Sequence, residues 1–454
     1  MPSHKTSPTS YRSLWSSHLG FILVTAGAAI GLGNIWRFPY VAGDNGGGVF
    51  VITYIVFLAA IGLPAMIAEL LIGRRGKQNA VNTLVSLAKE SHRSKHWGLL
   101  GWLGSLILIM LLSFYSVVSG FALAYLSYAF TGTFSPENLH NIALLWDTLI
   151  EQPLLLIGWH TAFIVLTMII VAFGVNRGIE RTGRWMMPGL FIILFALVLY
   201  SAVFGQFKEA FLFLFSFKVQ DFTSSAVISA LGQAFFALAT GAGCILVYGS
   251  YLSKETNILK TVSIIAFLDL VVALLAGLAI FPIVFANGLS PAEGPGLMFK
   301  ILPLAFSQMP FPNIIAMLFF ILIIFAAWSS SISMAEPLVT LIIEKTRIKR
   351  FSASVWVGLL AWGLGIFSAL SFNVFKDVKI AHWNLFEVII GVPINILLPI
   401  GAFLFCVFAG WMMKEKYVSE ELASPSAVFY AAWRFAVRYL CPLSILVILI
   451  SLIF

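Results

Sequence analysis

The chain has 454 residues, of which 60% are hydrophobic and only 10% are charged, and its mean hydropathy is +0.98. Because soluble domains carry about 25% charged residues, this composition excludes an ordinary soluble domain and indicates a membrane protein. The formal net charge of +8 comes from basic residues that cluster in a few loops, a pattern that indicates membrane topology and speaks against a nucleic-acid partner.

Apolar segments of membrane-spanning length recur along almost the whole sequence. A hydrocarbon core of ~30 Å needs roughly 20 apolar residues in a helix. These segments are too long, and too uniformly apolar, for the strands of a barrel. The expected fold class is therefore an all-α integral membrane protein. Its eleven transmembrane helices are expected at about 18–40, 47–71, 98–130, 153–173, 184–206, 223–252, 260–287, 313–343, 352–371, 385–412 and 428–454.

Basic residues mark one side of this expected bundle. The positive-inside rule places their loops in the cytoplasm. We therefore expect a cytoplasmic N-terminal segment at 1–17, a cytoplasmic loop followed by the last helix within 413–454, and an external C-terminus. The polar N-terminus shows no short apolar segment with a cleavage site, so a multi-pass protein of the cell (inner) membrane is expected. The basic residues of these loops are Arg74, Arg75, Lys77, Lys89, Arg93, Lys95, Arg177, Arg181, Arg184, Lys345, Arg347, Lys349 and Arg350.

Two glycine-rich interruptions, five helices apart, divide the bundle into halves. The first apolar segment contains Gly31-Leu32-Gly33-Asn34, and the sixth contains ATGAGC, Ala239 to Cys244. Breaks at corresponding positions predict an inverted-repeat transporter with a binding site in mid-membrane. The transporter core would span 18–412, with repeats at about 18–206 and 223–412.

The broken turns need partners for the backbone groups that they free. An unsatisfied N–H or carbonyl group in lipid is costly, so cations and a zwitterionic ligand are natural partners. Close helix packing through small residues is the alternative. That alternative accounts for Gly27 and Gly31 but not for Asn34 and Arg37 in the same segment.

The chain resembles the neurotransmitter:sodium symporter family in its shorter bacterial form. The resemblance is carried by AGAAIGLGNIWRFPY (26–40), NGGGVFVITYIVFLAAIGLPAMIAELLIGRRG (45–76) and LGQAFFALATGAGC (231–244), preceded by Arg12, Trp15, Leu19 and Gly20. It runs from the first helix to the tenth. It implies the leucine-transporter-type fold and sodium-coupled amino-acid symport by alternating access.

The resemblance implies two cation sites, and hence one or two Na⁺ ions carried with the substrate. Site 2 would combine the backbone carbonyls of Gly27, Ile30 and Ala326 with the hydroxyls of Ser329 and Ser330. The last three residues are spaced i, i+3 and i+4, which puts them on one helix face, and all-oxygen ligation suits a hard cation. Serine hydroxyls that simply bond a carbonyl one turn earlier are the alternative.

Site 1 would use the Ala29 carbonyl, the Asn34 side chain, the seventh helix and the substrate carboxylate. Here the sequence departs from the family, because Ala237 stands where Ser or Thr is usual and Asp269 stands where some members have Asn. A carboxylate within the membrane is functional by default. We expect Asp269 to supply the fixed negative charge that replaces chloride, so no chloride requirement is expected. A proton carrier and a salt bridge are the alternatives.

The substrate class follows from what the first break lacks. Family members that carry monoamines have an aspartate where this chain has Gly31, so the substrate must bring its own carboxylate. The N–H groups of Leu32 and Gly33 and the Tyr115 hydroxyl would bind it. A small residue in the second break predicts a hydrophobic or aromatic L-amino acid, although each apolar lining residue taken singly is ordinary core packing. The side chain would be surrounded by Ala28, Leu111, Phe236, Ala239, Ala242, Ser330 and Met334.

The resemblance also implies an outer and an inner gate that contain charged residues. Arg37 would face the outer vestibule, and because Ile390 occupies the usual position of its acidic partner, Glu387 would take that role from about 5 Å along the helix axis. A charged residue that snorkels to the interface is the alternative, strongest for Arg12. The inner side would be closed by Arg12, Trp15 and Glu344, with Glu69 near the same end of the second helix.

Other function classes find less support. The sequence has no H-E-x-x-H or G-x-S-x-G pattern, and Cys244, Cys406 and Cys441 lie in apolar segments without a C-x-x-C pairing, so an enzyme is not expected. The expected partners are an amino acid and the lipid bilayer, with the chain a monomer or a homodimer. An amino-acid sensor, or a sodium-coupled carrier of another small carboxylate-bearing amine, remains open.

Overall fold

Helices account for almost the whole chain in the computed structural model, which describes residues 15–291, 294–380, 382–422 and 426–451. The first half contains α1 (His18–Ala29), α2 (Phe38–Asp44), α3 (Gly48–Phe57), α4 (Leu63–Gly76), α5 (Ala80–Glu90), α6 (Gly98–Phe130), α7 (Leu139–Ile150), α8 (Pro153–Ala172), α9 (Arg181–Phe204) and α10 (Phe207–Phe215).

The second half continues with helices and one short hairpin. In this hairpin β1 (Lys379–Ile380) pairs antiparallel with β2 (Trp383–Asn384). The helices are α11 (Ser224–Ala237), α12 (Cys244–Gly249), α13 (Ile258–Ala286), α14 (Ile301–Ser307), α15 (Pro312–Thr346), α16 (Arg350–Leu370), α17 (Leu385–Gly391), α18 (Leu398–Val407), α19 (Glu415–Leu422), α20 (Ala427–Phe435) and α21 (Cys441–Ser451).

Several neighbouring helices join through π-helical turns into single membrane-length rods. Within the described residues, nine such helices are long and apolar enough to span a membrane: Gly48–Gly76, Lys95–Phe130, Pro153–Ala172, Val175–Phe204, Ile258–Ala286, Pro312–Thr346, Arg350–Leu370, Leu385–Met412 and Ala427–Ser451. A tenth span is the bent pair His18–Ala29 and Gly33–Asp44, whose two parts meet at 49°. The expected broken first helix is therefore confirmed.

The sixth expected span, at 223–252, is not a continuous helix. The structure divides it into α11 and α12, and the turn between them contains Ala239, Gly241 and Gly243 at φ values of 52°, 99° and 74°. Left-handed backbone disfavours further helical turns. A Cβ atom on Gly241 would lie 2.9 Å from the Ala402 nitrogen of α18, so only glycine permits this close approach.

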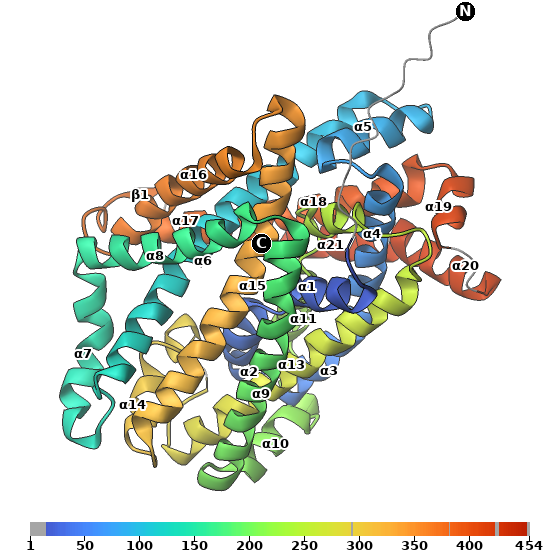
Figure 1. The fold of residues 1–454 in the computed structure, drawn as a ribbon. Coiled ribbons are helices and arrows are strands. Elements are labelled where there is room, and N and C mark those ends of the chain that lie inside the picture. Colours follow the sequence, from blue (N-terminus) through green and yellow to red (C-terminus); the bar gives the residue numbers. More distant parts are fainter. Residues whose placement is uncertain (1–14, 292–293, 381, 423–425, 452–454) are drawn as a thin grey trace, which may run out of the picture.

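Helix α15 is the central element of the bundle and lies beside α6, α1 and α9 (Figure 1). Its burial explains the long apolar run in its sequence, since a helix covered on most sides has little polar face. The α5 end of the molecule gathers the basic loops. There Asn79 contacts Glu344 at the end of α15, and Arg350 Nε donates a hydrogen bond to the Val171 carbonyl near the end of α8 at 2.8 Å. We call this end the basic end.

Candidate functional site: a cation and carboxylate site at the two helix breaks

The break after α1 faces two serines of α15. Helix α1 ends where Ile30 leaves helical backbone angles, at φ −72° and ψ 97°. Ser330 Oγ lies 3.2 Å from the Gly27 carbonyl and 3.5 Å from the carbonyls of Ala28 and Ile30. The structure therefore brings together, around Ser330, atoms that the sequence placed far apart.

The neighbouring serine completes this oxygen cluster. Ser329 Oγ donates to the Ala326 carbonyl at 3.0 Å, and a Cβ atom on Gly27 would lie 3.1 Å from the Ser329 Cβ. The five residues expected for site 2 thus lie at one point of contact between α1 and α15. Ser329 makes the local bond that the alternative interpretation expected, but Ser330 bonds across to the other helix. Carbonyl and hydroxyl oxygens are ligands that suit a hard monovalent cation.

Asn34 and Asp269 form the centre of the second expected cation site. Asn34 Nδ2 donates to Asp269 Oδ1 at 2.8 Å and to the Asp269 carbonyl at 3.0 Å. Tyr54 donates its hydroxyl to Asp269 Oδ2 at 2.9 Å. Both carboxylate oxygens thus have donors, whereas Asn34 Oδ1 is buried without a hydrogen-bond partner among the described residues. A buried acceptor of this kind is costly unless something fills its place.

Two further residues expected for site 1 lie at helix ends. Ala29 is the last residue of α1 and Ala237 is the last of α11, so their carbonyls belong to the group that lacks intrahelical donors. Within the described residues no group of three or more His, Cys, Asp or Glu side chains could hold a metal. A cation here would therefore rest on backbone, amide and hydroxyl oxygens beside the single Asp269 carboxylate.

The residues expected to bind a carboxylate adjoin the first cluster. A Cβ atom on Gly31 would meet Ser330 Oγ and would lie 3.4 Å from the Tyr115 hydroxyl. A Cβ atom on Gly33 would press against the Phe236 ring at 2.8 Å. Leu32 and Gly33 begin the helical turn Gly33–Arg37, and the first N–H groups of such a turn lack intrahelical acceptors. Backbone N–H groups and the Tyr115 hydroxyl thus lie around the small volume that Gly31 leaves open because it has no side chain.

The other expected pocket residues lie along two helix faces. Leu111 is one turn from Tyr115 on α6, and Met334 is one turn from Ser330 on α15, so each pair shares a face. Ala239 lies within the left-handed part of the second break.

Ala242, in the second break, lies beside an earlier turn of α6 than Leu111 does. A Cβ atom on Gly104 would lie 2.5 Å from the Ala242 carbonyl. Gly104 precedes Leu111 by two turns, about 10 Å along the helix. Ala242 is therefore placed toward the basic end of the pocket, below Leu111.

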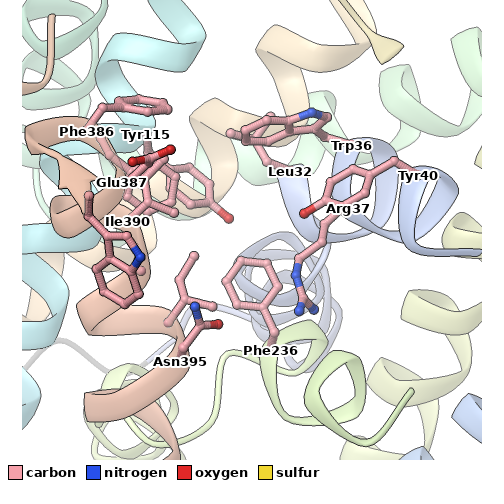
Figure 2. A pocket seen from close by; sticks show the side chains of 14 residues that line it. Leu32, Trp36, Arg37, Tyr40, Tyr115, Phe236, Phe386, Glu387, Ile390 and Asn395 are labelled. Atoms are coloured by element: carbon pink, nitrogen blue, oxygen red, sulfur yellow. The ribbon is translucent and has the colours of Figure 1, made fainter. Parts of the chain in front are cut away.

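A cavity of about 410 Å³ opens above these residues. Figure 2 shows Arg37 and Phe236 on one side of it and, on the other, Tyr115 next to Glu387 and Ile390 from α17. Aromatic rings of Trp36, Tyr40 and Phe386 complete its wall. The cavity thus joins the expected substrate residues to the expected outer gate.

The expected ion pair of the outer gate is not formed. Arg37 instead donates to Gln233 Oε1 at 2.5 Å and lies over the Phe236 ring, 5.3 Å from its centroid. Gln233 in turn donates to the Gly33 carbonyl at 2.9 Å. Glu387 accepts from the Asn384 backbone at 2.8 Å and so caps α17. The sequence interpretation missed Gln233, whose only signal is a polar side chain inside an apolar helix.

The inner side is described in part. Trp15 Nε1 donates to the Tyr248 carbonyl at 3.3 Å, and its ring meets the Tyr248 ring edge-on at 5.4 Å. Glu344 accepts from the Asn79 side chain at 2.6 Å and from its backbone at 3.0 Å. Arg12, the third residue expected there, lies outside the described residues.

Two buried carboxylates connect this region to neighbouring helices. Glu69 on α4 accepts a hydrogen bond from the Gly241 backbone in the second break, while its Oε2 has no partner among the described residues. Glu336 on α15 pairs with Arg350 and accepts from the Tyr251 hydroxyl at 2.9 Å. Sequence reasoning passed over Glu336, although an acid inside an apolar segment was the signal that identified Asp269.

Comparisons with known proteins agree with this geometry. The chain matches the profile of the "Sodium:neurotransmitter symporter family" over residues 12–147 and 150–454. It is 37% identical over 442 residues, 97% of either chain, to the Bacillus subtilis (strain 168) protein named "Uncharacterized sodium-dependent transporter YhdH". It is 26% identical over 391 residues, 76% of this chain and 64% of the relative, to the human "Sodium- and chloride-dependent GABA transporter 2".

A solved structure covers nearly the whole molecule. The crystal structure of MhsT in complex with L-phenylalanine is similar with a TM-score of 0.89 and 38% sequence identity, over 97% of this chain and 99% of that one. The expected fold class, an all-α membrane protein of the leucine-transporter type, is confirmed, and the structural relatives are transporters, not enzymes.

Proposed function

Because the chain belongs to the sodium:neurotransmitter symporter family, whose relatives here include a sodium-dependent transporter, we propose that it carries a hydrophobic or aromatic L-amino acid inward with sodium and without chloride. The observation that carries the proposal is the position of Ser330. Its hydroxyl contacts the α1 carbonyls and also adjoins the space that Gly31 leaves open. One side chain thus belongs to a cation site and to a carboxylate site.

Two sodium ions would bind, one at each oxygen cluster. The carbonyls of Gly27, Ile30 and Ala326 with the two serines would hold the first. The Asn34 amide oxygen, the α1 and α11 terminal carbonyls and Asp269 would hold the second, together with the substrate carboxylate. An ion here would supply the partner that the buried Asn34 Oδ1 lacks within the described part of the chain and would offset the Asp269 charge. Binding of sodium would therefore raise the affinity of the protein for the substrate, and binding of the substrate would raise its affinity for sodium.

Chloride independence rests on Asp269. A fixed carboxylate at the second cation site supplies negative charge there without an anion. At an effective dielectric constant near 20, a unit charge at about 4 Å is worth about 4 kcal/mol. The human GABA transporter 2, named as chloride-dependent, is a more distant relative, 26% identical over 391 residues.

The driving force follows from the charge moved. Two sodium ions and a zwitterion carry two net charges, worth about 4.6 kcal/mol per 100 mV. This energy supports roughly three decades of accumulation. Alternating access would arise from motion between the repeats at about 18–206 and 223–412, with the basic end and the N-terminus in the cytoplasm.

Substrate size rests on the aromatic cavity and on the second break. Phe236 and Tyr115 line the cavity, and Ala242 in the second break is small, which would leave room for a large side chain. The similar structure of MhsT holds L-phenylalanine, which fits such a pocket. A carrier of another small carboxylate-bearing amine is the second candidate, favoured by the name of the human relative.

A binding panel tests the proposal. The purified protein would be heated with each of twenty amino acids and with γ-aminobutyrate, in sodium and in choline. Sodium-dependent stabilisation by phenylalanine, tryptophan, leucine or tyrosine is expected, since a ligand at 100 times its Kd adds about 2.7 kcal/mol. Stabilisation only by γ-amino acids would favour the second candidate. Equal stabilisation in sodium and in choline would contradict the two proposed sodium sites.

A further inference from the structure

A second cavity, of about 450 Å³, lies on the outside of the bundle between α8 and α16. Its lining is almost wholly apolar and includes Met168, Val165 and Trp362. Glycine forms its floor: a Cβ atom on Gly358 would lie 2.8 Å from Met168 Cγ. The cavity shares no lining residue with the cavity at the helix breaks. We call it the α8–α16 groove.

The groove has the length of one membrane leaflet. It extends from Thr161 to Ala172 on α8 and from Phe351 to Trp362 on α16. Eleven residues of helix rise about 16 Å, which is about half of a ~30 Å hydrocarbon core. One end therefore lies at mid-membrane, and the other lies at the basic end, beside Arg350.

A single polar group lines the groove without a partner. Ser354 is 2% exposed, lines the groove, and its Oγ has no hydrogen-bond partner among the described residues. It lies one turn from Arg350, about 6 Å deeper along the helix. That depth corresponds to the boundary between headgroups and acyl chains. An unpartnered buried hydroxyl is costly, so a ligand with an acceptor at this depth would bind favourably.

Positive charge surrounds the same end of the groove. Lys345 is exposed in the last turn of α15, and Arg347 and Lys349 are exposed in the loop that leads into α16. Arg350 is already committed to Glu336 and to the Val171 carbonyl, so the exposed residues of the loop are the groups left to meet an anion. Basic residues at the membrane surface attract anionic headgroups.

We propose that the α8–α16 groove binds one anionic phospholipid from the leaflet at the basic end. One acyl chain lies along Met168 and Gly358, a glycerol ester carbonyl accepts a hydrogen bond from Ser354, and the phosphate lies against Lys349 and Arg347. A second copy of the chain is a poorer occupant. A two-fold axis along the membrane normal would bring two basic ends together, and like charges repel.

Native mass spectrometry of the purified full chain in detergent tests the proposal. Phosphatidylglycerol and phosphatidylcholine with the same acyl chains would be added at equal concentrations. One retained phosphatidylglycerol per protein is expected, in preference to phosphatidylcholine. Replacing Lys349 or Arg347 by Gln should lower its retention about fivefold each, and Ser354→Ala should lower retention of both lipids.

A groove-filling variant provides the steric test. Val165 is 49% exposed and lines the groove, so Val165→Trp should expel the lipid. Ile192→Trp on α9, at a site 69% exposed and outside the groove, should retain it. Circular dichroism and gel filtration would confirm that both variants fold, and Ser354→Ala, which removes one hydroxyl without filling the groove, tests the hydrogen bond separately.

Three outcomes would overturn the proposal. The first is equal retention of the two lipids by the wild-type chain together with unchanged retention by Val165→Trp. The second is a dimer that Val165→Trp dissociates, which would assign the groove to a second copy. The third is tight binding of inorganic phosphate that displaces the lipid, which would reduce the site to the basic loop alone.

Discussion

Asn34 and Asp269 are joined by two hydrogen bonds, from one amide nitrogen to the carboxylate at 2.8 Å and to the Asp269 backbone carbonyl at 3.0 Å. The pair ties the break after α1 to the middle of α13. Because the amide nitrogen is consumed in this way, the amide oxygen of Asn34 is left pointing elsewhere, buried and without a partner among the described residues. A cation that binds this oxygen next to Asp269 would satisfy both groups.

Replacing Asp269 by Asn tests this pair. The change keeps the shape of the side chain but removes its charge, so sodium affinity should fall by at least about tenfold, since a few kcal/mol of attraction is lost. A sodium titration of the melting temperature measures the effect. Tyr54→Phe is the control: it removes only the 2.9 Å hydrogen bond to the other oxygen and should weaken sodium binding far less. Equal losses in the two variants would contradict a direct ionic role.

Chloride dependence should change with the same residue. Wild-type transport should proceed unchanged when gluconate replaces chloride, because the fixed carboxylate supplies the negative charge. In Asp269→Asn, chloride should restore part of the activity. Measuring exchange at several pH values separates the alternative role, since a proton carrier would lose its pH dependence on substitution. Wild-type activity that returns only on addition of chloride would contradict the assignment.

Ser330 and Ser331, which are adjacent on α15, provide a matched pair of variants. Ser330→Ala removes the hydroxyl that lies 3.2 Å from the Gly27 carbonyl, so sodium-dependent stabilisation and uptake should both fall at least about tenfold. Ser331 is buried and its Oγ has no hydrogen-bond partner among the described residues. Ser331→Ala should therefore leave sodium binding unchanged and leave stability equal or slightly higher. Equal losses of sodium binding in the two variants would indicate that Ser330 acts through helix packing and is not part of a sodium site.

Substrate size should respond to Ala242. Ala242→Phe adds an aromatic ring toward the basic end of the pocket, so competition assays should show preference moving from phenylalanine and tryptophan to smaller amino acids. Val→Ala changes elsewhere in the apolar core are a poor control, because they create cavities. Gly363→Ala is suitable, since a Cβ atom there would have no neighbour within 4 Å. An unaltered size profile in Ala242→Phe would remove this residue from the pocket.

The sequence alone could predict most of the fold and part of the site. Apolar length identified the spans, and paired glycines marked both breaks, because these depend on local chemistry and on lipid. The turn between α11 and α12, at 238–243, lies within one residue of the predicted Ala239–Cys244, but the close approach of Gly241 to α18 is a tertiary contact, which no local pattern reveals.

Pairings between distant side chains were harder to foresee. Arg37 was expected to meet Glu387, yet it bonds to Gln233, whereas Glu387 closes a capping box with Asn384. The choice between two polar partners depends on a few ångströms of tertiary geometry. Tyr54 escaped notice for the same reason, since one tyrosine in an apolar helix gives no hint of the carboxylate it meets.

Uptake into proteoliposomes measures the central claim most directly. Vesicles containing the purified chain would receive labelled L-phenylalanine under an inward sodium gradient, with an inside-negative potential set by potassium and valinomycin. We predict accumulation above the external concentration that collapses when choline replaces sodium, and that increases with the potential because net charge moves inward. Uptake of equal rate and extent in choline would contradict sodium coupling and with it the assignment of both oxygen clusters.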